Sequence, residues 1–337
     1  ELCFGTVDSW LLYNLTGGEV HATDVTNASR TLLFNIHTLE WDKKMLNTLR
    51  VPIEMMPDVF PSSNIFGHYN SSIHGNIPIA AILGDQQSAL FGQCCFTTGM
   101  AKNTYGTGCF MLMNTGAEIP TSNSGLLNTI AWKIGDKTTY ALEGSVFIAG
   151  AAVQWLQNGI EIIDDISATS EIASREAKKN PDSSVVVVPA FAGLGTPYWD
   201  MHARGAILGL TRDSGRDSII RATLESIAFR SKDVLDAMQE DSGISLFALK
   251  VDGGASVNDY LMQFQSDILG VSVERLSFVE STAAGVAYMA ALTIGELTLN
   301  EISKLPELER SFDPEKSLEW REEKKAVWSK AIERIVL

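Results

Sequence analysis

The chain has 337 residues, of which 45% are hydrophobic and 20% are charged. This balance is typical of globular domains and excludes a disordered or fibrous protein. At this length we expect about two domains, because single hydrophobic cores stop growing near ~250–300 residues. The formal net charge of −15 would repel a polyanion over most of the surface, so we expect no nucleic-acid partner. An anionic ligand would need a local pocket of backbone N–H groups or basic side chains.

Targeting and metal signals are weak. No apolar run approaches the ~20 residues that cross a bilayer, so we expect no membrane insertion. The first residues contain neither Met nor a basic stretch, which argues against a signal peptide and indicates a start inside a longer gene product. The five histidines share no i,i+4 spacing, so no histidine metal site is predicted. We expect a cytoplasmic protein with reduced thiols, because metal-binding spacing is absent from the four cysteines, Cys3, Cys94, Cys95 and Cys109.

The N-terminal part of the chain alternates between helix and strand signals. Apolar residues across 6–15 favour a helix, and this makes a phosphate-binding turn at residues 5–9 the weaker interpretation. The apolar run 77–83 predicts a buried strand, and residues 86–93 predict a short helix directly after it.

The composition changes after Gln93. Residues 94–116 are rich in Thr, Gly, Asn and Cys, which predicts hairpin strands around a tight loop at residues 105–108. We therefore place the main domain boundary near Gln93. Further on, the β-branched run 184–188 before Pro189 predicts a buried strand.

A strand–turn–helix unit is predicted in the last third of the chain. Residues 217–238 carry apolar residues in steps of three and four, which predicts a long amphipathic helix. Residues 246–251 then alternate as a strand, residues 252–254 turn, and residues 257–269 predict another helix, which together form an α/β unit. The charged segment 314–325 predicts a solvated terminal helix that ends in an apolar tail.

A carboxylate follows the apolar run at the end of its predicted strand. Asp85 and Gln86 come directly after residues 77–83 and Gly84, and the carboxyl ends of strands are where open α/β sheets form ligand crevices. Asp85 is therefore a candidate general base. The alternative is an N-cap, in which the carboxylate accepts the N–H of the third helical residue. The spacing leaves both interpretations open.

Two glycine-containing turns could face a phosphate. Residues 104–108 can bring backbone N–H groups close to an anion, although a hairpin turn without ligand uses the same residues. Residues 251–254 with Asn258 form either a nucleotide edge or a plain βα turn. Gln154 follows the small residues 149–152, where a flat ligand or simple core packing would fit equally. The sequence contains neither a P-loop nor the motifs of protein kinases.

Together and in order, these segments resemble the FGGY family of carbohydrate kinases over nearly the whole chain. The motifs Asn27-Ala-Ser-Arg-Thr31 and Tyr105-Gly-Thr-Gly-Cys-Phe110 are most similar to those of its glycerol-phosphorylating members. The matching stretches are Gly5–Leu11, Thr26–His37, Gly84–Gln87, Ala101–Gly116, Tyr140–Gly144, Val188–Asp200, Ala203–Arg212 and Val251–Gly254.

The resemblance implies an α/β fold with two actin-like (ribonuclease H-like) ATPase domains and a cleft between them. Residues 1–93 would form the C-terminal part of the first domain, on the substrate side, and residues 94–337 a complete nucleotide-binding second domain. The family's phosphate-binding Asp-x-Gly-Thr hairpin, its substrate-clamping Arg-Glu pair and its Tyr lie upstream and are absent from this sequence. We therefore expect the first domain to be incomplete and this C-terminal portion to be inactive alone.

The implied activity is ATP-dependent phosphorylation of glycerol to glycerol 3-phosphate with Mg²⁺. Asp85 would be the base and would bind glycerol together with Gln86 and Phe110. No protein metal ligand is assigned, and a homo-oligomer is expected at full length. Two alternatives remain open: a kinase for another polyol or sugar, and a non-catalytic nucleotide-binding or assembly module. ATP or ADP would contact five residues, Thr107, Gly150, Gln154, Gly254 and Asn258.

Overall fold

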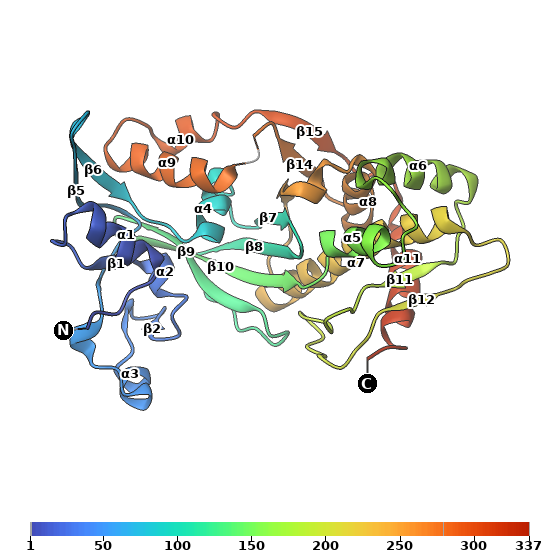
Figure 1. Ribbon diagram of the computed structural model, residues 1–337, viewed down its shortest axis with the longest axis horizontal. Helices are drawn as coiled ribbons and strands as arrows, with labels where there is room; N and C mark the ends of the chain where they lie inside the picture. The colour runs from blue at the N-terminus through green and yellow to red at the C-terminus, as the bar shows by residue number, and fades with distance from the viewer. Residues whose placement is uncertain (1, 279, 337) are drawn as a thin grey trace.

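The computed structural model describes residues 2–278 and 280–336. It is an elongated α/β molecule with one nine-stranded mixed sheet along its length (Figure 1). Parallel pairing joins β13 to both β7 and β14, whereas the β7–β8, β8–β10, β10–β9 and β5–β6 pairs are antiparallel. The strands lie in the order β15 (Leu308–Phe312), β14 (Val273–Leu276), β13 (Ala248–Asp252), β7 (Met100–Tyr105), β8 (Cys109–Gly116), β10 (Lys137–Val146), β9 (Leu127–Ile134), β5 (Ser63–Ser71) and β6 (Gly75–Ala81).

Three two-stranded sheets supplement the large one. They pair β1 (Ala22–Asp24) with β4 (Asp58–Phe60), β2 (Phe34–Asn35) with β3 (Glu40–Trp41), and β11 (Val186–Val188) with β12 (Ala206–Leu208).

The helices gather in two groups at opposite ends of the large sheet. Helices α4 and α9 pack on one another, with α9 along β5 and β6 and α4 against β7, β8 and β9, whereas α5 to α8 with α11 lie at the other end (Figure 1). The α-helices are α1 (Val7–Leu15), α2 (Val25–Ala28), α3 (Lys43–Leu49), α4 (Asp85–Gly92), α5 (Gly150–Asn158), α6 (Thr169–Lys179), α7 (Arg216–Ser242), α8 (Asp259–Leu269), α9 (Ser281–Thr293), α10 (Leu299–Ile302) and α11 (Leu318–Ile332). Short 3₁₀ turns are η1 (Ile53–Met55), η2 (Ile166–Ala168) and η3 (Gly254–Val257).

The two faces of β7 have different partners, because successive side chains on a strand point to opposite sides. On one face, Asn103 donates to Ser231 of α7 (3.3 Å) and Tyr105 donates to Gln265 of α8 (2.8 Å). On the other face, Lys102 reaches the start of α4. One side of the strand thus packs in the main core, and the other side contacts the start of α4 through Lys102.

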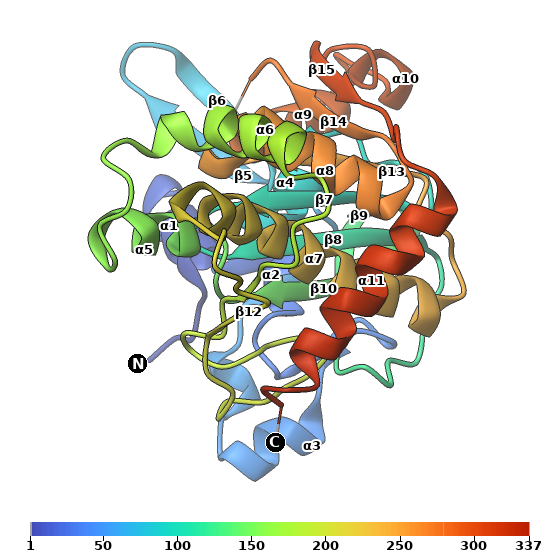
Figure 2. The ribbon, with the colours of Figure 1, turned by 90° about the vertical axis from the view of Figure 1, so that its right-hand side faces the viewer.

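The main hydrophobic core lies between the sheet and α7, α8 and α11. The buried residues of helix α7 lie between Ser218 and Met238, which is the segment where the amphipathic pattern was predicted, and the helix continues to Ser242. Helix α11 runs across the outer side of α7 and α8 (Figure 2). There, Trp328 stacks on Phe229 with ring centroids 5.0 Å apart.

Several predicted elements are confirmed with small shifts of their ends. Residues 7–15 form the predicted helix, with Thr6 at its N-cap position. The hairpin loop at residues 105–108 connects β7 to β8, and β13 is followed by η3 and α8. The predicted strand at 184–188 becomes β11. All four cysteines are free thiols.

One burial prediction was wrong. The run 77–83 was expected to be a buried strand, but it belongs to β6, an edge strand in which Ile77 is 39% exposed. Among the described residues no strand lies beyond β6 in the sheet, and Pro78 suits such an edge because it lacks an N–H to donate. The solvated terminal helix is confirmed over its charged part, because α11 starts at Leu318 and no residue of 314–325 is buried. The helix packs on the core only beyond this segment, through Trp328, Ala331 and Ile332.

Within residues 2–278 and 280–336, no helix combines the length and the apolar character needed to cross a membrane.

Two glycines allow α4 and α9 to cross at very short distance. A Cβ atom at Gly92 would overlap the carbonyl oxygen of Ser281, and one at Gly285 would overlap the carbonyl oxygen of Ser88. The apolar residues Leu90, Phe91 and Met289 close the contact. Because α4 lies before residue 93 and α9 after it, this crossing joins the two predicted domains, whose division stays a prediction.

We expect Gly285→Ala to lower the free energy of unfolding by about 1–3 kcal/mol, since the added methyl group has no space. In an unobstructed helix interior the same change is stabilising by about 1 kcal/mol. Gly215→Ala is the control, because a Cβ at Gly215 meets nothing within 4 Å. Urea unfolding of both variants measures the effect, and equal stabilities would show that the crossing tolerates a side chain.

Candidate active site

A buried carboxylate fixes the chain just before α4. Asp24 accepts hydrogen bonds from the hydroxyl of Ser62 (2.6 Å) and from the backbone N–H groups of Thr26 and Asn27 (both 3.0 Å). The Thr26 hydroxyl donates to Asp24 (2.8 Å) and accepts the N–H of Gly84 (2.8 Å). Burial raises the pKa of Asp24, and these donors oppose the rise by stabilising the charged form. Gly84, the residue before α4, is therefore held in place by the hydrogen bonds of Thr26 and Asp24.

Asp85 is the first residue of α4, and its side chain is exposed. Its Oδ1 accepts the N–H of the next residue, Gln86 (2.7 Å). The N-cap alternative was wrong, because Gly84 occupies the N-cap position and no side chain caps this helix. The carboxylate is thus available to accept a proton from a ligand hydroxyl.

Lys102 is the residue of this site that the sequence reasoning missed. It is completely buried on β7 and donates to the side-chain oxygen of Gln86 and to the hydroxyl of Thr104 (3.0 Å). Burial lowers the pKa of Lys102 to about 8, while the carboxylates of Asp252, Glu143 and Asp85 act in the opposite direction. No local pattern marks this lysine, which stands between two other buried residues of its strand.

Two further carboxylates lie near Lys102. Asp252 faces Thr104 across the β13–β7 pair, and its Oδ2 accepts from Gln93 (2.8 Å) and from the hydroxyl of Ser281. Its Oδ1 is buried and has no hydrogen-bond partner among the described residues. Glu143 of β10 pairs instead with Arg30 at 2.8 Å. The end of β7 is therefore bordered by negative charge that attracts a cation.

Phe110 lies on the same face of the sheet as these polar groups. It pairs with Thr104 in the β7–β8 hairpin, and paired residues of an antiparallel ladder share a face. Its side chain is 44% exposed. A large exposed ring beside Lys102 and Thr104 provides an apolar surface for the carbon atoms of a small ligand.

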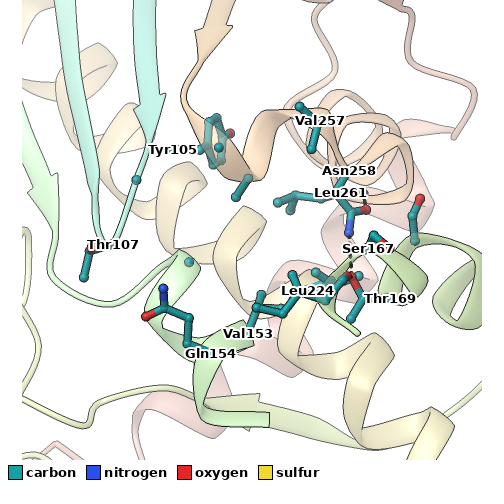
Figure 3. A pocket seen from close by; sticks show the side chains of 16 residues that line it. Tyr105, Thr107, Val153, Gln154, Ser167, Thr169, Leu224, Val257, Asn258 and Leu261 are labelled. Atoms are coloured by element: carbon teal, nitrogen blue, oxygen red, sulfur yellow. Dashed lines mark hydrogen bonds between the residues drawn. The ribbon is translucent and has the colours of Figure 1, made fainter. Parts of the chain in front are cut away.

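A second part of the site is a cavity of about 350 Å³ beyond the 105–108 loop. Figure 3 shows Thr107 and Gln154 on one side of it, with Asn258 and Val257 on the other. Val153, Leu224 and Leu261 supply apolar walls. The structure brings all five predicted nucleotide residues to this one cavity: Thr107, Gly150, Gln154, Gly254 and Asn258.

Asn258 has a structural task as well. Its side-chain oxygen accepts the N–H of Leu261 (3.0 Å) as the N-cap of α8, and its Nδ2 donates to Thr169 (3.0 Å), the bond drawn in Figure 3. Both polar groups of its amide are thus used within the protein. The side chain shapes the wall of the cavity, and a ligand there would contact its outer surface.

The hairpin loop and α5 are joined through backbone groups. The carbonyl oxygen of Gly106 accepts the N–H of Gly150 (2.9 Å), and that of Thr107 accepts the N–H groups of Ala149 (2.8 Å) and Ala151 (3.1 Å). The loop thereby satisfies the first N–H groups of α5. On the other side, Gly253 has φ +86° and a Cβ there would lie 2.6 Å from the Tyr105 carbonyl oxygen, so only glycine fits.

The fold and this two-part site define a class of protein. Residues 2–92 match the N-terminal domain of the FGGY family of carbohydrate kinases, and residues 101–294 match its C-terminal domain. The chain belongs to this family, whose members share a two-domain, actin-like (ribonuclease H-like) ATPase fold.

Within this family, the chain is similar to glycerol kinases over nearly its whole length. It is 58% identical to the glycerol kinase of Thermoanaerobacter sp. (strain X514) over 99% of this chain and 67% of that protein, and 55% identical to glycerol kinase 2 of Thermotoga maritima with the same coverage. The crystal structure of Plasmodium falciparum glycerol kinase with ADP superimposes with a TM-score of 0.93 at 40% identity, covering 99% of this chain and 67% of that one. A xylulose kinase from Lactobacillus acidophilus shares the fold (TM-score 0.84, 20% identity, coverage 96% and 66%).

The lowered pKa of Lys102 predicts a specific pH dependence of stability. A lysine in the unfolded chain titrates near ~10.4, whereas burial brings Lys102 to about 8 in the folded protein. Between these two pKa values the unfolded chain binds more protons than the folded protein, so the free energy of unfolding should increase as the pH rises. Lys102→Met lacks this gain. Urea unfolding at about pH 7.5 and about pH 10 should show wild type gaining stability relative to the variant, and a constant or falling difference would contradict the assignment.

Proposed function

We propose that this chain carries the catalytic base and the nucleotide pocket of an ATP:glycerol phosphotransferase, which forms glycerol 3-phosphate and ADP. One observation supports this most directly. Strand β7 contacts Gln86, the neighbour of the exposed Asp85, through Lys102, and ends in the 105–108 loop that borders the cavity. A single strand therefore connects the polar groups around Asp85 with a cavity of the size that small-molecule ligands occupy.

In the proposed reaction, Asp85 accepts the proton of the terminal glycerol hydroxyl. The hydroxyl oxygen forms a bond to the γ-phosphorus of ATP, the bond from this phosphorus to the bridging oxygen breaks, and ADP leaves. Gln86 binds the polyol oxygen, and Phe110 covers the carbon atoms. Phosphoryl transfer depends mainly on positioning and charge neutralisation, which fits a site with one exposed carboxylate and backbone-rich loops.

The nucleotide would occupy the cavity near Gly254 and Asn258. Its apolar walls suit a purine ring, and the open space above Gly254 admits a flat group close to the backbone. Thr107 and Gln154 then lie on the side where the phosphates would approach β7 and Asp85. The ADP that the Plasmodium falciparum structure contains supports the same ligand class.

Mg²⁺ would enter with the nucleotide. Within the described residues there is no group of three or more His, Cys, Asp or Glu side chains that could hold a metal. Mg²⁺ on a nucleotide needs only one or two carboxylates, with phosphate and water as its other ligands. The unpartnered Oδ1 of Asp252 fits this requirement, while Asp85 stays free to act as the base. When bound, the ion would neutralise charge on the transferring phosphate.

The proposal extends to the organisation of the whole protein. We keep residues 1–93 as part of a substrate-side domain and residues 94–337 as a nucleotide-binding domain. The chain spans 67% of the length of the glycerol kinases that it matches, and we expect turnover to need the remaining third.

Free thiols and dependence on ATP favour the cytoplasm, and self-association of the complete protein stays a prediction. A kinase for another polyol or sugar is less favoured, because similarity to a xylulose kinase is only 20%.

Asp85→Asn tests the assigned base. In the protein expressed at the length of these relatives, glycerol-dependent ADP formation should fall about 10²–10⁴-fold, because an amide cannot take the hydroxyl proton. Affinity for ADP should be unchanged. Asp136→Asn, in the exposed turn between β9 and β10, is the control and should retain full turnover. Activity of the Asp85 variant within about threefold of wild type would overturn the proposal.

Gly254→Val tests the nucleotide pocket in the chain itself. A Cβ at Gly254 meets nothing within 4 Å, so the variant should fold normally while its side chain fills space that the nucleotide needs. We expect ADP affinity to fall at least about tenfold in calorimetry. Gly215→Val adds the same side chain at another open position, outside the cavity. Equal ADP affinity in both variants would place the nucleotide elsewhere.

A further inference from the structure

The surroundings of Lys102 are unusual for a buried cation. Its side chain is fully buried, yet within residues 2–278 and 280–336 it forms no ion pair. Both of its hydrogen-bond partners are neutral oxygens, on Gln86 and Thr104. Across the hairpin it pairs with the buried Leu112. Burying an ammonium group without a carboxylate partner is costly, so an apolar residue would serve packing better.

The ammonium group determines which way the Gln86 amide faces. A protonated lysine can only donate, so the group that it contacts must be the side-chain oxygen of Gln86. The NH₂ group of the amide is then directed away from Lys102. In the described part of the chain this NH₂ group donates to no protein acceptor, and Gln86 is partly exposed. Two N–H donors are therefore left for a ligand beside Asp85.

We propose that Lys102 is a positioning residue, which holds the Gln86 amide with its NH₂ group toward the polyol. This inference rests on the proposed function of Asp85 and Gln86. The reacting hydroxyl donates its proton to Asp85, and its oxygen accepts an N–H bond from Gln86. A flipped amide would present a second acceptor beside the carboxylate, and one O–H group cannot satisfy two acceptors. Lys102 thus acts on substrate affinity through Gln86.

A double-mutant cycle tests whether Lys102 acts through Gln86. Lys102→Met, Gln86→Met and the double variant are compared in the protein expressed at the length of its relatives. Each single change should raise the KM for glycerol roughly 10–100-fold, because a buried hydrogen bond is lost. The double variant should differ from Gln86→Met by less than about threefold, since the orienting contact has already been removed. The Kd for ADP should stay within about twofold of wild type.

The control is Lys250→Met. Lys250 lies directly opposite Lys102 in the β13–β7 pair, but it forms an ion pair with Glu274 and does not contact Gln86. Glycerol KM should be unchanged in this variant. Gln86→Glu is a second test that leaves Lys102 in place. Its carboxylate keeps the contact with Lys102 but offers no N–H to the substrate, so glycerol KM should rise as much as in Gln86→Met.

Two results would overturn the inference. If the effects of Lys102→Met and Gln86→Met multiply in the double variant, Lys102 acts independently of the amide, for example on the phosphoryl group through kcat. If Gln86→Glu keeps the wild-type KM, the N–H donor is not used. The proposed function fails separately, when Asp85→Asn remains active. If Asp85→Asn is inactive and the effects of Lys102→Met and Gln86→Met are independent, the proposed function stands and only the positioning role of Lys102 is refuted.

Discussion

The hydrogen bonds of the buried Asp24 carboxylate are the interaction on which the geometry of the candidate active site depends. It collects N–H and O–H donors from α2 and from Ser62, and through Thr26 it reaches the backbone of Gly84. A charged group in this position can be satisfied only if all of these segments stay in place. The position of Asp85, the next residue, is therefore set by contacts with residues distant in sequence, and α4 starts where this network ends.

Helix α4 is held on two further sides. Its end crosses α9 through Gly92 and Gly285 without space for a side chain, and its beginning is bonded to β7 through Gln86 and Lys102. A short helix restrained at both ends can hold a reactive side chain within the narrow range of positions that phosphoryl transfer requires. The residues that provide these restraints are mostly neutral or buried, whereas the carboxylate of Asp85 beside them is exposed.

The sequence predicted the features that depend on neighbouring residues. The 105–108 loop, the helix around residues 217–238 and the position of Asp85 at the start of a helix follow from local pattern. The buried run 77–83 and the capping role of Asp85 failed, because each depends on what packs there from elsewhere in the chain. Lys102 had no signal at all. Its importance arises only when β7 meets α4.

The two ends of the nine-stranded sheet differ in their protection against added strands. At one end β15 carries Glu309 and Arg310, which pair with charged residues of the neighbouring elements. At the other end β6 presents an uncharged, partly exposed stretch, and Pro78 is the one residue there that cannot donate a backbone hydrogen bond. Unwanted association between copies of this chain would therefore begin at the β6 edge, and charged substitutions there offer a direct way to keep the protein dispersed at high concentration.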